Sequence, residues 1–297
     1  MRLGARFPLG KPNWPSSVPR PPVVRRTGVD YQTAWARNPV ARVARAVIVD
    51  DVLRPALHAL ASPEVHGSDR LVGLEAPAIF VANHHSHLDT GLLLTSLPER
   101  FRHRAIVAAA ADYFFTSRAK GAFSALAIGA IPMERTKVGR RSADLAAELL
   151  EEGWNLVMFP EGGRSPDGWG RAFRGGAAYL SLRCSRPVVP TYLAGTGRLW
   201  KRGTRLPKPA GRGQGAHLVF GAPMWPEEGD DARRLAARIE TSVAGLADEW
   251  STDWWSARRR AASGATPSLT GPTGGAWRRA WALDADAADR SGRRVWP

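Results

Sequence analysis

The sequence has little cysteine, few acidic residues and no long uncharged segment, and each shortage excludes a class of protein. Its single cysteine, Cys184, excludes a disulfide framework within the chain. The longest uncharged apolar stretch covers residues 121–133, which is shorter than the roughly 20 residues of a membrane-spanning helix. The first residues lack the apolar segment of a secretory signal. We therefore expect no signal peptide and no transmembrane span.

The shortage of acidic residues leaves the chain strongly basic. Its 297 residues include 42 Lys and Arg against 27 Asp and Glu, which gives a formal net charge of +15. Such a surface attracts nucleic acid, anionic lipid or phosphorylated substrates. Charge alone is therefore compatible with a basic polyanion-binding module without catalysis. The sequence contains no nucleic-acid-binding signature, so we expect no nucleic-acid partner.

Short apolar runs alternate with helix-like runs through the middle of the chain. The strand-like runs cover residues 74–82, 105–110, 154–159, 187–193 and 217–220. Pro132 lies in a further run and favours an edge or irregular strand there, because proline cannot donate to a sheet ladder. The alternation predicts an α/β fold with a mostly parallel or mixed central sheet flanked by helices, within a domain of residues 63–250.

The segments on either side of this domain have a different composition. Residues 1–28 are rich in Pro, Arg and Gly, and we expect a flexible basic arm. Residues 29–62 are expected to form an N-terminal helical segment with one apolar face: Val40, Val43, Ala44, Val47 and Ile48. This face could pack on the core or lie on a membrane, with arginines beside anionic headgroups. Residues 251–297 form a basic tail that we expect to be disordered, although its Trp and Arg side chains could also contact a bilayer interface.

Polar side chains gather in residues 81–90, VANHHSHLDT, where a strand-like run gives way to a helix-like one. Ligands of α/β sheets bind at such strand ends. With His84 in the turn and Asp89 in the first helical turn, the two side chains can face each other. A carboxylate beside a neutral imidazole fixes its tautomer and makes it an oriented general base. The nearby helix N-terminus would keep the ring unprotonated.

The same segment permits two other interpretations. Ser86 and Asp89 have the Ser-x-x-acid spacing of a capping box, so Asp89 could simply cap the helix. His84, His85 and His87 could bind zinc, but their spacing lacks the i, i+4 pair of a helical zinc site. We therefore expect no metal site in this segment.

Two further charged turns follow strand-like runs. The segment GAIPMER ends at Arg135, and FPEGGRS covers residues 159–165 with Arg164 near its end. An arginine can hold a phosphate group with two parallel hydrogen bonds, and glycines let the backbone approach a ligand closely. Each turn alone is weak evidence, because such turns are common.

Taken in order, NHHSHLD, GAIPMER, FPEGGRS and the PVVP of residues 187–190 resemble the four motifs of the glycerolipid acyltransferases, the lysophosphatidate acyltransferase-like family. The resemblance covers roughly residues 74–223 and implies that His84 and Asp89 are catalytic. It implies these substrate-binding residues: Arg135, Glu161, Gly162, Gly163 and Arg164. Two departures stand out, since Gly163 replaces the usual Thr and Pro132-Met133 replaces aromatic or aliphatic residues.

The resemblance implies an O-acyltransferase of phospholipid biosynthesis. Such an enzyme moves a fatty acyl group from acyl-CoA or acyl-carrier protein to the hydroxyl of a lysophospholipid, here 1-acyl-glycerol-3-phosphate. His84 would take the hydroxyl proton, oriented by Asp89, without a metal or resident cofactor. Glu161 would position Arg164 or an acceptor hydroxyl, since a carboxylate repels phosphate. Glycerol 3-phosphate and a phosphate-free lipid stay open as alternative acceptors.

The resemblance and the composition together predict where the protein works. We expect a peripheral protein on an anionic membrane surface, at the cytoplasmic face. The chain has no G-x-S-x-G segment, which argues against an α/β-hydrolase. Neither the acyl-chain length nor the oligomeric state follows from the sequence.

Overall fold

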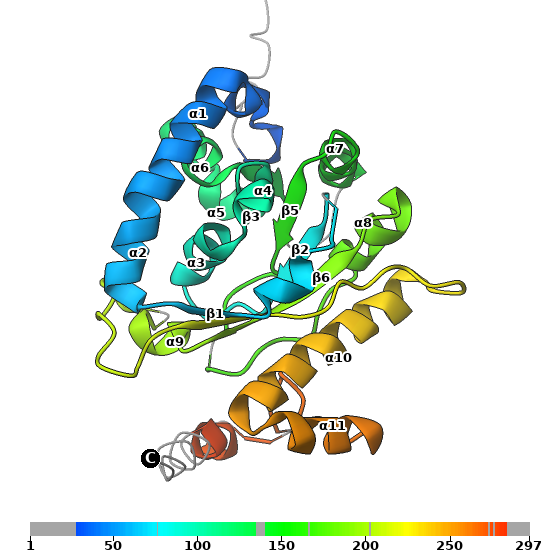
Figure 1. Ribbon diagram of the computed structural model, residues 1–297. Coiled ribbons are helices and arrows are strands. Elements are labelled where there is room, and N and C mark those ends of the chain that lie inside the picture. Colours follow the sequence, from blue (N-terminus) through cyan, green and yellow to red (C-terminus); the bar gives the residue numbers. More distant parts are fainter. Residues whose placement is uncertain are drawn as a thin grey trace, which may run out of the picture.

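The computed structural model describes residues 28–75, 77–134, 140–165, 167–201, 203–272, 274–275 and 277–283. Apart from Gly28, the expected basic arm lies outside these residues, and so does Arg135. Within the described residues, seven strands form one sheet in the order β1-β7-β6-β2-β5-β3-β4 (Figure 1). The strands are β1 (Glu64–His66), β2 (Ile79–Ala82), β3 (Ala105–Ala110), β4 (Ala130–Met133), β5 (Asn155–Met158), β6 (Val188–Ala194) and β7 (His217–Phe220).

The sheet is mixed, which confirms the predicted fold class. Strands β2 to β6 run parallel to one another, whereas β7 pairs with β6 antiparallel and with β1 parallel. Strand β4, which contains Pro132, forms one edge of the sheet, as the missing proline donor predicts. Because β2 to β6 run in the same direction, their carboxyl ends lie at the same end of the sheet. Ligands bind outside these carboxyl ends in open α/β sheets.

Helices cover both faces of the sheet (Figure 1). They are α1 (Pro39–Val47), η3 (Ile48–Leu53), α2 (Arg54–Ala61), α3 (Leu88–Ser96), α4 (Glu99–Arg102), α5 (Ala111–Phe114), α6 (Arg118–Ile128), α7 (Arg140–Glu151), α8 (Gly176–Cys184), α9 (Thr196–Leu199), α10 (Ala232–Ser251) and α11 (Trp254–Ala262). Shorter 3-10 turns are η1 (Gly28–Asp30), η2 (Ala34–Arg37) and η4 (Ser68–Leu71). None of the helices in the described ranges combines the length and the apolar character needed to cross a bilayer.

The core divides into two layers because successive side chains of a strand point to opposite faces. In β2, Phe80 packs with the buried leucines of α3 on one face. Its neighbours Ile79 and Val81 pack with α7, α8 and α10 on the other. A strand buried on both faces reads as a continuous apolar run, which is why 79–82 contains no polar residue.

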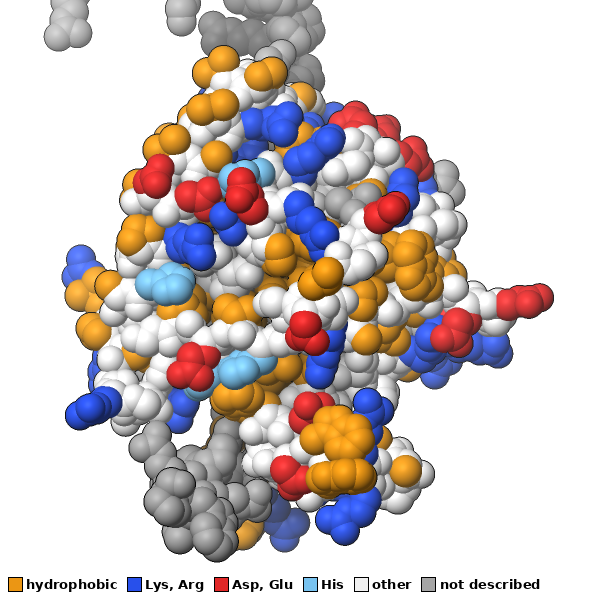
Figure 2. All heavy atoms as spheres, viewed as in Figure 1, with side chains coloured by type: hydrophobic (Ala, Val, Ile, Leu, Met, Phe, Trp, Pro, Cys, Tyr) orange, Lys and Arg blue, Asp and Glu red, His pale blue; other side chains and the backbone are white. Residues whose placement is uncertain are grey.

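The N-terminal helical run places its apolar face toward solvent. Val40, Val43 and Val47 are 79%, 67% and 50% exposed, and hydrophobic side chains follow α1 down the upper left side of the molecule in Figure 2. The buried residues of α1 are instead Ala41 and Arg45, and the guanidinium of Arg45 donates to the carbonyls of Leu126, Ala105 and Ala36. The interpretation that this valine face packs on the core is therefore wrong. The hydrogen bonds of Arg45 orient the helix. The spacing of hydrophobic residues in the sequence gives no sign of such bonds.

The described part of the expected tail is folded. Asp253 caps α11 by accepting from the N–H of Ser256 at 2.9 Å. Arg260 on α11 pairs with the carboxylate of the buried Asp248 on α10, at 2.6 and 2.8 Å. The expectation of disorder beyond residue 251 is therefore wrong for the described residues. The basic composition suggested disorder because it does not show which arginines form ion pairs with acidic residues elsewhere in the fold.

Candidate active site

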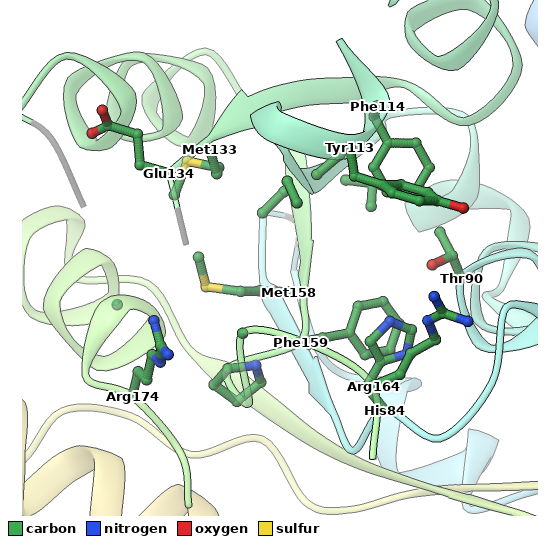
Figure 3. Close-up of a pocket in the computed structure, with 18 of the residues that line it drawn as sticks. His84, Thr90, Tyr113, Phe114, Met133, Glu134, Met158, Phe159, Arg164 and Arg174 are labelled. Carbon is green, nitrogen blue, oxygen red and sulfur yellow. The ribbon is translucent and has the colours of Figure 1, made fainter. Parts of the chain in front are cut away.

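Four of the parallel strands end at one cavity of about 230 Å³ (Figure 3). His84 follows β2, Tyr113 and Phe114 follow β3, Glu134 follows β4, and the segment 159–164 follows β5. In Figure 3, His84 and Arg164 lie together at one end of the cavity and Met133 and Glu134 at the other. The motifs that lie far apart in the sequence therefore meet at the carboxyl ends of the parallel strands.

His84 and Asp89 form a hydrogen-bonded pair. The ring Nδ1 of His84 lies 2.9 Å from Oδ2 of the fully buried Asp89. Burial alone would raise the pKa of Asp89, but hydrogen bonds from His84 and from the backbone of Ser86 lower it below its ordinary value. Asp89 is therefore an ionised acceptor for Nδ1–H, which leaves Nε2 of His84 as the basic nitrogen.

Asp89 also caps the helix that follows. Its Oδ2 accepts from the backbone N–H groups of His85 and Ser86, both at 2.7 Å. The hydroxyl of Ser86 in turn accepts from the N–H of Leu88, at 3.2 Å. The capping interpretation and the dyad interpretation are thus compatible, because the same carboxylate oxygen accepts from the imidazole and from the backbone. The cap fixes the carboxylate at the helix start, and the carboxylate fixes the imidazole.

The ring of His84 is held from a second side by the FPEGGRS turn. It stacks on Phe159 with ring centroids 4.3 Å apart and planes inclined by 26°. The backbone of His84 also joins this turn, because its carbonyl accepts from the N–H of Ser165 at 2.9 Å. The first and third motifs are therefore one hydrogen-bonded unit around the imidazole.

Glu161 connects two loops and does not line the cavity. Its carboxylate accepts from the N–H of His84 at 2.8 Å and from the N–H of Arg171 at 3.1 Å, and its side chain is buried. Burial raises the pKa of Glu161 to about 7, although the two backbone donors oppose this shift. The expectation that Glu161 positions Arg164 or an acceptor hydroxyl is replaced by a role in holding the backbone of His84.

Asn83 ties the site to β6, a role that the sequence analysis missed. Its side-chain amide donates to the carbonyl of Leu193 at 2.9 Å and accepts from the N–H of Leu193 at 2.7 Å. The two bonds continue the pairing of β2 with β6 one residue beyond the strand end. A polar residue placed directly after a fully buried strand was the available signal.

Cationic groups surround the glycines of the third motif. Arg164, Arg171 and Arg174 all line the cavity, and only Arg164 was predicted from the sequence. Gly162 has a φ of +69°, and a Cβ there would meet the guanidinium of Arg174 at 3.0 Å. The space over these glycines is therefore occupied by arginine side chains of the same loop. The remaining predicted arginine, Arg135, lies outside the described residues.

Gly163 is less constrained than its neighbour. A Cβ at this position would meet only the Nη1 atom of Arg171, at an ordinary contact distance of 3.6 Å. The Cβ of the threonine that the family usually carries would therefore meet no close contact here. Glycine at this position leaves the loop without the hydroxyl that a threonine would supply.

The two other histidines of the first motif have separate surroundings. His87 lines the cavity, where its ring lies 5.0 Å from that of Trp200 and 6.2 Å from that of Tyr113. Burial lowers the pKa of His85 below its ordinary value. In the part of the chain that the structure describes, His84, His85 and His87 do not bring three ligand atoms within 4.8 Å of one another. The zinc interpretation receives no geometric support.

Most of the remaining cavity wall is apolar, although Thr90, Tyr113 and Glu134 also line it. It is formed by side chains from β3, α6, β4 and β5 and from the turns after them: Val107, Ile128, Met133, Met158, Phe159 and Phe114. The cavity thus has His84 and Arg164 at one end, apolar side chains along its wall, and Glu134 and Arg174 at the other end (Figure 3). This combination suits a ligand with a charged or polar head and an apolar chain.

The C-terminal segment braces the loop that carries the arginines. The N–H of Gly170 donates to the carbonyl of Leu269 at 2.8 Å, and the indole of Trp169 donates to the carbonyl of Arg279 at 3.0 Å. Arg279 pairs with Asp167 at 2.7 Å. Because Arg171 in the same loop donates to Glu161, contacts extend without interruption from the C-terminal segment to His84.

Comparisons with known proteins agree with the resemblance read from the motifs. Residues 62–194 match the family model described as Acyltransferase. The chain is 32% identical over 143 residues to the chloroplastic 1-acyl-sn-glycerol-3-phosphate acyltransferase LPAT1 of Arabidopsis thaliana. It is 30% identical over 184 residues to 1-acyl-sn-glycerol-3-phosphate acyltransferase alpha of Bos taurus. These alignments cover 47% and 60% of this chain, and 38% and 60% of the respective relatives.

A solved structure shares the fold. The 1-acyl-sn-glycerophosphate acyltransferase PlsC from Thermotoga maritima aligns with a TM-score of 0.57 at 22% identity, over 74% of this chain and 86% of that one. The family model and the curated relatives confirm the predicted resemblance to the glycerolipid acyltransferases, and the solved structure shows the shared fold. The C-terminal brace lies beyond the residues that the family model matches.

Proposed function

We propose that this chain, which carries a domain of the glycerolipid acyltransferase family, transfers a fatty acyl group from a thioester to the hydroxyl of a lysophospholipid. The observation that carries the proposal is the pair of His84 and Asp89 at one end of a cavity whose wall is largely apolar. The names of the curated relatives, which are 1-acyl-sn-glycerol-3-phosphate acyltransferases, support the same chemistry.

In the proposed reaction, Nε2 of His84 takes the proton of the acceptor hydroxyl as its oxygen attacks the thioester carbonyl. The new C–O bond forms, the C–S bond breaks, and the imidazolium returns the proton to the leaving sulfur. Asp89 holds Nδ1–H in place and stabilises the imidazolium while it exists. General acid–base catalysis of this kind contributes about 100- to 10,000-fold. No step requires a metal ion or a resident cofactor.

We propose 1-acyl-glycerol-3-phosphate as the acceptor, with its phosphate at Arg164. Figure 3 places this arginine beside His84, so a phosphate held there would keep a glycerol hydroxyl near the base. Arg171 and Arg174 add positive charge to the same loop. The donor would be acyl-CoA or acyl-carrier protein, with the acyl chain along the apolar wall. Glycerol 3-phosphate and a phosphate-free lipid are the alternative acceptors.

We further propose that the protein acts as a peripheral protein on an anionic membrane surface at the cytoplasmic face. The valines of α1 are exposed in a stripe at i, i+3 and i+7, the pattern of a helix that lies on a bilayer. Trp254 and Trp255 are also exposed, and the guanidinium of Arg258 lies over the ring of Trp254. Both surfaces fit the interface between water and acyl chains.

The acceptor proposal is tested with Arg164→Ala. We expect KM for lysophosphatidate to rise while KM for the acyl thioester changes less, because a ground-state contact with the phosphate is lost. Arg164→Lys should restore only part of the affinity, since a point charge cannot reproduce the planar fork. Arg233→Ala, at an exposed position at the start of α10, is the matched control. An unchanged acceptor KM in Arg164→Ala would reject the phosphate contact and leave the dyad untouched.

A further inference from the structure

A second cluster of polar side chains lies away from the acyl-transfer cavity, on strands β1 and β7. Glu64 and His66 stand two residues apart on β1, so they point to the same face of the sheet. His217 is the register partner of Glu64 on β7. Two hydrogen-bonded strands therefore bring one carboxylate and two imidazoles together at the edge of the sheet opposite β4.

The distances within this cluster suit a metal ion better than hydrogen bonding. Oε2 of Glu64 lies 3.4 Å from Nδ1 of His217 and 3.9 Å from Nε2 of His66. One ligand atom from each of the three residues lies within 4.8 Å of the other two. Ligand atoms about 2.0–2.1 Å from a tetrahedral zinc ion lie roughly 3.3 Å from one another. The separation of Glu64 and His217 matches that edge length, whereas His66 must move closer to the other two residues to share an ion with them.

His217 contributes a second, independent observation. Its Nδ1 is buried and makes no hydrogen bond, despite its short distance from Glu64. A buried ring nitrogen without a hydrogen bond is uncommon in folded proteins, and a metal ion would satisfy it.

The rings are also held in place. Trp250 of α10 packs against both imidazoles, with ring centroids 4.2 Å from His217 and 5.3 Å from His66. The two imidazoles stack on each other at 6.0 Å. Ligands that stand on paired strands and pack against an indole lose little freedom when they bind an ion, which favours affinity. The exposed sides of Glu64 and His66 give an ion access from solvent.

We propose that Glu64, His66 and His217 form a binding site for a divalent transition-metal ion such as Zn²⁺. Two imidazoles and one carboxylate are a donor set that suits zinc, nickel or copper. Three protein ligands leave a coordination position for water. The ion would join β1, a strand of three residues at the sheet edge, to β7 and so fasten the N-terminal helical run to the sheet.

The test titrates ZnCl₂ into the full chain by isothermal titration calorimetry near neutral pH. We expect His66→Ala and Glu64→Gln to weaken zinc binding by roughly tenfold or more, because even outer-shell partners of a metal ligand are worth about 10- to 100-fold in affinity. His58→Ala is the matched control, since His58 is exposed on α2 and lies outside the cluster. Both exposed ligand positions of β1 should accept these changes without loss of the fold.

A second measurement follows thermal unfolding with and without ZnCl₂. An ion that binds the folded state should raise the midpoint in the wild type and in His58→Ala, but not in His66→Ala. Zinc affinity that is equal in all three proteins would overturn the proposal, because the ion would then bind elsewhere. Absence of any zinc-dependent heat or midpoint shift in the wild type would overturn it as well.

Discussion

At the scale of single residues, one atom, Oδ2 of Asp89, both caps a helix and orients the imidazole of the proposed base. It accepts from the imidazole of His84 and from two backbone N–H groups at the start of α3. Glu161 holds the backbone of the same histidine, because its carboxylate accepts from the backbone N–H of His84. The imidazole is thus positioned by two buried carboxylates. Only Asp89 touches the ring, and the two carboxylates have opposite pKa shifts.

The raised pKa of Glu161 makes the stability of the protein depend on pH. The unfolded chain releases this proton near pH 4.5, whereas the folded chain holds it to about 7. Between these values the folded state binds more protons, so stability should fall as pH rises. Each pKa unit corresponds to about 1.4 kcal/mol. Glu161→Gln has no proton to release, so its stability relative to the wild type should be greater at pH 8 than at pH 5.

Urea unfolding at the two pH values measures this difference directly. Glu151→Gln, at an exposed position at the end of α7, provides the control, because the same chemical change is made at a carboxylate on the surface. A stability difference between wild type and Glu161→Gln that is the same at both pH values would contradict the buried, proton-holding carboxyl.

At the scale of elements, the site depends on segments outside the four sequence motifs. The loop between β5 and α8 carries Arg164 and Arg171, and contacts with Leu269 and Arg279 hold it. The helix α1 is oriented by the buried Arg45, which leaves its valines exposed. Each element therefore gives a prediction of its own.

Arg279→Ala should loosen the loop that carries the cavity arginines. The ion pair with Asp167 would be lost, together with bonds from Arg279 to the carbonyls of Thr270 and Pro272. A partly exposed ion pair contributes little to global stability, about 1 kcal/mol or less. We therefore expect a several-fold rise in acceptor KM with a small change in the unfolding midpoint. Arg278→Ala, one residue away, should leave KM unchanged; equal effects of the two changes would argue against the brace.

Replacing Val40, Val43 and Val47 together by Ser should weaken attachment to membranes. These side chains are exposed, so the free energy of unfolding should change little, whereas burial in a bilayer is worth about 25 cal/mol per Å² of apolar surface. Sedimentation with anionic vesicles measures the attachment. A matched triple change of the exposed Arg233, Arg234 and Glu228 to Ser controls for general surface effects. Vesicle binding that survives the valine changes would place the attachment on another surface.

At the scale of the whole molecule, the sequence predicted the alternation of strands and helices but not the contacts that close the fold. The strands 105–110 and 217–220 were predicted to the residue, because they are apolar runs between clear breaks. Strand β1 was missed, since its three residues are exposed and show no alternation. The orientation of α1 and the folded C-terminal segment depend on long-range arginine contacts, which local patterns do not contain.

The residues of the candidate site could likewise be predicted only in part. His84 and Asp89 could be predicted because both belong to one motif, where a turn and a helix start bring them together. The roles of Asn83, Arg171 and Arg174 were missed, because β6 and the loop after β5 give these residues their positions. The net charge of +15 suits an anionic surface, and the dyad at the cavity favours an enzyme over a simple polyanion-binding module.

The central claim is that His84 is the base of acyl transfer and that Asp89 orients it. The most direct measurement compares kcat for acyl transfer in the wild type, His84→Ala, Asp89→Asn and His85→Ala, with circular dichroism confirming that each variant folds. We expect kcat to fall by about 100- to 10,000-fold in His84→Ala and nearly as far in Asp89→Asn, with a much milder effect in His85→Ala. An active His84→Ala protein beside an inactive His85→Ala protein would contradict the account.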